Sequence, residues 1–202
     1  MCLDPALSGT FVPPSPPRRR PPAIPTHRYT SRRLSYAALL IAAGLTGVYA
    51  ESIPNFEVLT LVVFGSGVLL GARDGSLVGA LTMLVYTLLN PYGPAPPLVM
   101  LAQVLGSAMA GAAGAWFAVL GLPARPAIVR AAVLTLAAIV VTALYDLLTN
   151  VATGLVFGQP RYWILAGIPF SLWHIGYNVA LFVALGTPLT AVFARYAERL
   201  SS

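Results

Sequence analysis

Long apolar stretches separated by short polar segments occupy the chain from residue 35 onward. A helix of about 20 apolar residues spans the hydrocarbon core of a bilayer. The pattern therefore predicts six membrane-spanning helices, at residues 35–50, 57–72, 75–90, 97–121, 127–157 and 162–194. The last two exceed one bilayer thickness, so we expect them to tilt or to extend beyond the core. The predicted fold class is an all-α integral membrane protein, a bundle of six transmembrane helices.

The polar ends of the chain define the predicted domains. Residues 1–34 are rich in proline and arginine, which favours an extended, solvated cytoplasmic tail. Residues 35–195 form the six-helix transmembrane domain, and residues 196–202 a short cytoplasmic C-terminus. An alternative interpretation starts from Ser31-Arg32-Arg33, which imitates a twin-arginine leader with cleavage after Ala50 and would remove the first helix.

The composition limits the possible functions. Of the 202 residues, 57% are hydrophobic and 9% are charged, whereas soluble domains carry about 25% charged residues, so a soluble globular enzyme is excluded in practice. All 12 basic residues are arginines, which excludes a Walker A phosphate loop because that motif requires a lysine. Cys2 is the only cysteine, so no disulfide framework or cysteine metal site can form within one chain.

The arginines are distributed unevenly between the two sides of the predicted bundle. Six spans place both termini on one side, together with every arginine except Arg161. Basic residues concentrate on the cytoplasmic side of membrane proteins. We therefore expect both termini to be cytoplasmic, in a prokaryotic inner membrane. The eleven arginines on that side are Arg18, Arg19, Arg20, Arg28, Arg32, Arg33, Arg73, Arg125, Arg130, Arg195 and Arg199.

Polar and aromatic side chains within the spans fall mostly in the outer half of the predicted membrane. Residues four apart share a helix face. Asp146 and Asn150 therefore share one face, and His174 and Asn178 share another. Trp173 and Tyr177 lie beside the second face. This pattern predicts a small polar pocket with aromatic walls, open to the outside. The other candidate ligand-binding residues are Asn90, Tyr92, Gln103, Tyr145 and Trp163.

Two alternatives for these residues stay open. Asp146 and His174 could simply pair with each other, so that each satisfies the other's buried polar group. Tyr92 and Trp163 would then anchor the helices at the membrane interface. An intramembrane Asp beside a His is also typical of proton-coupled carriers. Against a proton path, the inner halves of the spans carry no chain of ionisable groups apart from their terminal arginines.

Small residues at four-residue spacing mark two of the spans. Ala38 and Ala42 lie on one face of the first, and Gly106, Ala110 and Gly114 on one face of the fourth. Such faces let helices approach closely. Packing within the bundle is the simplest interpretation, and contact with a partner helix is the other.

Catalytic motifs are missing from the sequence. The only histidines are His27 and His174, which excludes a His-Glu-x-x-His zinc protease. Ser66 and Ser171 lack the glycine pattern and the oxyanion-hole pattern that a serine nucleophile requires. Asp146 and His174 are too few ligands for a metal. We therefore expect no enzymatic activity, no cofactor, no metal site and no nucleic-acid partner.

Five short motifs follow one another along the helices: Pro54-Asn55-Phe56-Glu57, Gly71-Ala72-Arg73-Asp74-Gly75, Asn90-Pro91-Tyr92-Gly93, Tyr145-Asp146-Leu147-Leu148-Thr149-Asn150 and Trp173-His174-x-x-x-Asn178. In order and spacing they resemble the substrate-binding S components of energy-coupling factor (ECF) vitamin transporters, over about residues 35–195. The long Pro-rich tail departs from the usual compact S component.

The resemblance implies a function and a set of partners. A protein of this family captures a vitamin-like micronutrient from outside and docks on a transmembrane coupling protein driven by two cytoplasmic ATPases. Docking through an Ala-x-x-x-Ala face of the first helix corresponds to Ala38 and Ala42 here. The family's substrate position, under the loop joining the first two helices, corresponds to Gln103, Asp146, Asn150, His174 and Asn178, with Glu57 next to that loop.

The substrate itself is not specified by the sequence, because one fold binds unrelated vitamins through a few pocket side chains. Aromatic residues with an Asp and Asn pair suit a flat heterocycle. An autonomous proton-coupled carrier is the alternative function, and a membrane scaffold that binds nothing is a third.

Overall fold

The computed structural model describes residues 30–49, 58–91 and 93–201, and the regular elements within these ranges are all helices. They are α1 (Ser31–Tyr49), α2 (Leu59–Leu70), α3 (Ala72–Leu88), α4 (Pro97–Val119), η1 (Leu122–Ala124), α5 (Ala127–Phe157), α6 (Pro160–Leu181), η2 (Phe182–Gly186) and α7 (Thr187–Ser201). The prediction of an all-α fold is confirmed for these residues. Each predicted span coincides with a helix, and the last one covers α6, the π-helix η2 and most of α7.

Proline and glycine set several helix boundaries. Pro97 and Pro160 stand in the first turns of α4 and α6, where the missing N–H of proline costs no helical hydrogen bond. Gly71, which separates α2 from α3, has a φ of 87°, and Gly158 after α5 has a φ of 79°. These left-handed conformations favour glycine and end the helices sharply.

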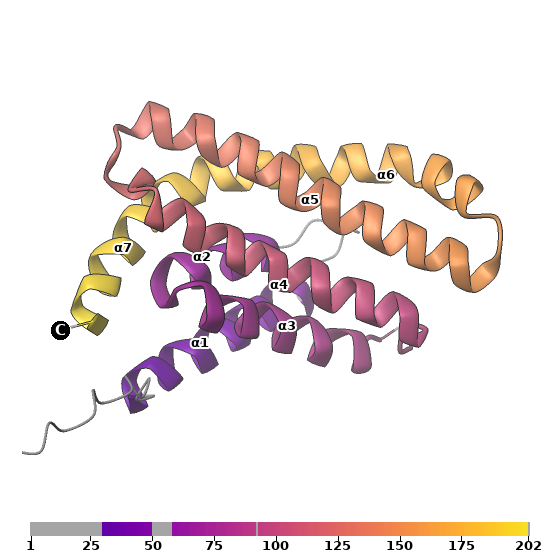
Figure 1. Ribbon diagram of the computed structural model, residues 1–202, viewed down its shortest axis with the longest axis horizontal. Helices are drawn as coiled ribbons and strands as arrows, with labels where there is room; N and C mark the ends of the chain where they lie inside the picture. The colour runs from indigo at the N-terminus through magenta and orange to yellow at the C-terminus, as the bar shows by residue number, and fades with distance from the viewer. Residues whose placement is uncertain (1–29, 50–57, 92, 202) are drawn as a thin grey trace, which may run out of the picture.

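Successive helices run up and down the bundle (Figure 1). Segments far apart in the sequence therefore meet at each of its two ends. At one end, Tyr36 and Leu40 of α1 pack with Leu70 of α2 and with Ala197 and Leu200 of α7. At the other end, the Tyr49 hydroxyl of α1 donates to the Leu89 carbonyl after α3. The first described helix therefore begins, and the last ends, at the same end of the molecule.

The arginines of the described residues collect at that shared end, which we call the basic end. It holds the first turns of α1, α3 and α5, the α4–α5 connection and α7. Arg33 donates to the Asp74 carboxylate at 2.8 Å and also to the Leu70 carbonyl, which ties α1 to the corner between α2 and α3. The basic end comprises Arg32, Arg33, Arg73, Arg125, Arg130, Arg195 and Arg199, and Arg161 lies at the opposite end.

Helices α2, α3 and α4 pack with their backbones in contact along a line of glycines that we call the glycine seam: Gly67, Gly75, Gly79, Gly111 and Gly114. A Cβ added at Gly75 would lie 2.5 Å from the Cα of Gly67, and one at Gly79 would lie 2.5 Å from the carbonyl oxygen of Ser107. Small residues permit this close approach. The small-residue face of the fourth predicted span therefore serves packing within the bundle.

Helix α2 forms the centre of the fold, with ten of its twelve residues buried. Phe64 is completely buried and makes edge-to-face contacts with Phe117 of α4 and Phe182 of η2, at ring-centroid distances of 5.6 and 5.1 Å. At 1.5 Å per residue α2 is about 18 Å long, shorter than the roughly 30 Å hydrocarbon core.

Three of the described helical stretches are long and apolar enough to cross a membrane: Pro97–Val119, Ala127–Phe157 and the continuous stretch Pro160–Leu200. Their length and composition are consistent with a membrane protein. Helices α1 and α3 are 19 and 17 residues long, and α1 begins with Arg32 and Arg33.

Candidate functional site

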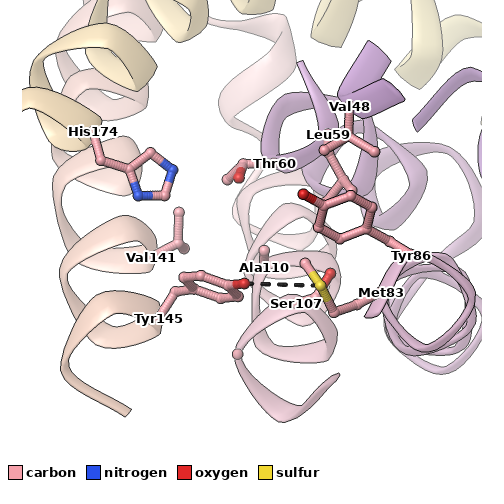
Figure 2. A pocket seen from close by; sticks show the side chains of 11 residues that line it. Val48, Leu59, Thr60, Met83, Tyr86, Ser107, Ala110, Val141, Tyr145 and His174 are labelled. Carbon is pink, nitrogen blue, oxygen red and sulfur yellow. Dashed lines mark hydrogen bonds between the residues drawn. The ribbon is translucent and has the colours of Figure 1, made fainter. Parts of the chain in front are cut away.

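A cavity of about 80 Å³ lies inside the bundle, where helices α1 to α6 all contribute side chains. His174, Val141 and Tyr145 face Thr60, Tyr86 and Met83 across it (Figure 2). In α1 and α3 the lining residues stand near the helix end that is remote from the basic end. The described lining residues are Val48, Leu59, Thr60, Met83, Tyr86, Gly106, Ser107, Ala110, Val141, Tyr145 and His174.

The polar part of the site is built on the α5–α6 hairpin. His174 Nδ1 lies 2.9 Å from Asp146 Oδ1, and the two side chains are only 7% and 13% exposed. If the imidazole is neutral, a hydrogen bond from Nδ1–H to the carboxylate makes Nε2 the acceptor nitrogen of the ring. The pair also fixes the orientation of a ring that lines the cavity.

A second polar contact joins the same two helices one turn away. Asn178 Nδ2 donates to Thr142 Oγ1 at 3.1 Å, and both side chains are almost completely buried. Residues 142 and 146 share one face of α5, and residues 174 and 178 share one face of α6. The two contacts therefore form parallel rungs between α5 and α6, and Thr142, not the predicted Asn150, accompanies Asp146 on the α5 side.

Tyr145 and Tyr86 supply the aromatic walls. The Tyr145 ring stands edge-on to His174 at a centroid distance of 6.2 Å, and its hydroxyl donates to the Met83 sulfur at 3.8 Å. A Cβ at Gly106 would lie 2.7 Å from Tyr145 Cδ2, so a glycine in α4 makes room for this ring. Tyr86 packs edge-on against Tyr49 at 5.8 Å.

The predicted site residues fall into two groups by position. Tyr145 and His174 line the cavity. Asp146 contacts His174 directly, and Asn178 forms the next rung with Thr142. Gln103 is half-buried on α4, one helical turn from the lining residue Ser107.

Trp173 and Asn150 lie elsewhere. Trp173 is 54% exposed on the surface of α6, because consecutive helical residues point about 100° apart and its neighbour His174 faces inward. The expectation that Trp173 walls the same pocket as His174 does not fit this placement. The Asn150 side chain packs over Gly167, where a Cβ would lie 2.9 Å from Asn150 Cγ.

The remaining predicted residues stand outside the described cavity lining. Trp163 forms an aromatic cluster with Phe157 and Tyr162 at the α5–α6 turn, at centroid distances of 5.9 and 5.8 Å. Tyr177 is half-buried on α6, and Asn90 follows the end of α3. Glu57 and Tyr92 lie outside the described residues, as does the Pro54–Glu57 motif.

Several lining residues were missed from the sequence. Ser107 stands four residues after Gln103 on the same face of α4, and that spacing could have identified it. Thr60, and Thr142 as the partner of Asn178, gave no such signal, because a threonine in a helix often bonds only to its own backbone. No group of three or more potential metal ligands occurs among the residues that the structure describes.

Comparisons of the chain with protein-family models, with curated proteins and with solved structures found no match. The function is therefore inferred from the site and the sequence alone.

Proposed function

We propose that the protein is the membrane-embedded substrate-capture subunit of an ECF-type importer. It binds a vitamin or related micronutrient from outside and delivers it with a transmembrane coupling protein and two cytoplasmic ATPases. The bundle has six membrane-spanning helices in the lipid bilayer, with both termini and the basic end in the cytoplasm. The observation that carries this proposal is the cavity where six helices meet around the buried Asp146–His174 pair.

The position of the cavity supports capture from outside. It lies away from the basic end, and basic residues favour the cytoplasmic side. A mostly apolar lining with a few convergent polar groups is the usual composition of a small-molecule site. At about 80 Å³ the cavity is smaller than typical pockets of roughly 300–1,000 Å³, so a vitamin-sized ligand must push its aromatic walls apart.

The surface of α1 supports docking on a partner. Ala38 and Ala42 are exposed, and Ala38 lies in a shallow apolar groove between α1 and α3. A flat helix face of this kind suits close packing with another membrane helix.

The first test concerns ligand capture. The full chain is purified gently from its own membranes and examined by native mass spectrometry for retained small molecules and protein partners. Asp146→Ala and His174→Ala are expected to lose the retained solute, whereas Trp173→Ala, one residue from His174 but on the surface, is the matched control and keeps it. Equal loss in all three variants would show that the cavity is not the binding site.

The second test concerns docking. Ala38→Trp is expected to abolish co-purification of an ATPase-bearing complex while leaving the retained solute in place. Ala132→Trp, at an exposed alanine of α5, is the control for the bulk of the new side chain. An unchanged complex in the Ala38 variant contradicts docking through this face.

The alternative is an autonomous proton-coupled carrier, favoured by the buried carboxylate–imidazole pair. Between this pair and the basic end, the described residues offer no further Asp, Glu or His. Uptake into vesicles that lack any ATPase, with collapse when the proton gradient is dissipated, would replace the importer proposal by this one.

A further inference from the structure

Four buried side-chain oxygens on α4, α5 and α6 have no hydrogen-bond partner among the described residues: Gln103 Oε1, Ser107 Oγ, Asp146 Oδ2 and Asn178 Oδ1. Three of them, the carboxylate oxygen and the two amide oxygens, can only accept hydrogen bonds. Asn178 and Ser107 are 0% and 4% exposed. Buried polar atoms are nearly always paired in folded proteins, so these four oxygens call for a donor that the described chain does not supply.

The four oxygens come from three helices that also contribute lining residues to the cavity. Ser107 lines the cavity, and Gln103 lies one turn away on the same face of α4. Asp146 binds the cavity-lining His174, and Asn178 shares the face of α6 that carries His174. Each acceptor is therefore a lining residue, a direct partner of one, or one helical turn from one.

The described cavity lining offers little positive charge. No arginine lines the described cavity, because the arginines stand at the basic end or, for Arg161, at the α5–α6 turn. His174 is the only lining group that can carry a positive charge, and it already faces the Asp146 carboxylate. An anion entering this site would be desolvated without a cation to compensate it, which is costly.

We infer that the ligand of this site is a neutral or cationic molecule that donates hydrogen bonds through N–H or O–H groups, and that it carries no carboxylate or phosphate. The inference rests on the proposed function, since it assumes that the cavity is the capture site. Amino-substituted heterocycles fit it best: their N–H groups meet the acceptors of α4 to α6, while the ring packs between Tyr86 and Tyr145. Ordered water is the competing donor.

The test uses matched pairs of probes that differ in one group. Nicotinamide is compared with nicotinate, and pyridoxamine with 4-pyridoxate, each at millimolar concentration, by thermal stabilisation of the purified full chain in detergent. The amide and amine members are expected to stabilise the protein, and the carboxylate members to bind at least tenfold more weakly. Equal or tighter binding of the carboxylates, or no stabilisation by any probe, overturns the inference.

A double variant tests whether the unpartnered acceptor oxygens bind the ligand or only ordered water. Thr142→Val with Asn178→Leu replaces both members of one rung by apolar side chains of similar size, which is nearly neutral or stabilising for the fold. The variant is expected to unfold at or above the wild-type temperature and to bind the amide and amine probes at least tenfold more weakly. A lower unfolding temperature with unchanged probe affinity would show that the acceptors bind water only.

Failure of this inference can be told apart from failure of the proposed function. A protein that co-purifies with ATPases but prefers the carboxylate probes overturns the ligand class alone. A protein that prefers the donor probes but supports gradient-driven uptake without any ATPase overturns the importer proposal alone.

Discussion

Adding one methyl group to the glycine seam should unfold the bundle at a lower temperature. In Gly75→Ala, the new Cβ would lie 2.5 Å from Gly67 Cα and 2.8 Å from Gly67 N, whereas ordinary contacts begin at 3.4 Å. Both atoms belong to the backbone and cannot rotate away, so α2 and α3 must separate by about 1 Å, and overpacking of this kind costs about 3 kcal/mol. The higher helix propensity of alanine adds about 1 kcal/mol to the free energy of unfolding. The net loss of stability is therefore about 2 kcal/mol.

The matched control is Gly176→Ala in α6, an exposed glycine with nothing within 4 Å of an added Cβ. This substitution meets no steric obstacle, so only the stabilising helix propensity of alanine remains. For a chain of this size, 1 kcal/mol shifts the unfolding temperature by roughly 2–4 °C. Gly75→Ala is therefore expected to lower the temperature by roughly 4–8 °C and Gly176→Ala to raise it by roughly 2–4 °C, measured by thermal aggregation and size-exclusion chromatography in detergent. Equal unfolding temperatures would refute backbone contact at the seam.

Two further predictions concern the ends of the bundle and the cavity wall. The side chains of Arg33 and Asp74 are only 19% and 14% exposed. A double-mutant cycle with Arg33→Met and Asp74→Leu should therefore give a coupling free energy of about 1–3 kcal/mol. A coupling below about 0.5 kcal/mol would show that the pair contributes no more than an ordinary surface salt bridge. Gly106→Ala should displace the Tyr145 ring and weaken binding of the retained solute without preventing folding, and undiminished binding would show that Tyr145 does not shape the site.

The helices could largely be predicted from the sequence, because their apolar stretches have the length that a bilayer requires. Helix α1 begins at Ser31 and not at residue 35, since Arg32 and Arg33 are compatible with a helix although they are poor residues for a span. The break into η2 at Phe182–Gly186 was not predicted, although Gly186 and Pro188 mark it in the sequence. Proline has no N–H to donate to the carbonyl four residues earlier, which here belongs to Ala184 within η2.

The site could be predicted only in part. Four-residue spacing groups Asp146 with Asn150 on one helix and His174 with Asn178 on the other. The structure joins Asp146 to His174 and Asn178 to Thr142, whereas Asn150 packs over Gly167. Trp173 was included because it is aromatic and adjacent to His174, but adjacency along a helix turns a side chain to another face. Contacts between helices far apart in sequence, such as Thr60 with the α5–α6 side of the cavity, follow from the bundle geometry and leave no local pattern.

The glycine seam also bears on the order in which the protein assembles. Its helices, α2 to α4, are consecutive in the chain and meet through backbone atoms, so little side-chain freedom is lost when they pack. Contacts between neighbours in sequence form fastest, and chains emerge from the ribosome N-terminus first. We expect α2 to α4 to pack together while α5 and α6 are still being synthesised. The hairpin that carries Asp146 and His174 then joins a preformed three-helix unit, and the cavity is completed last.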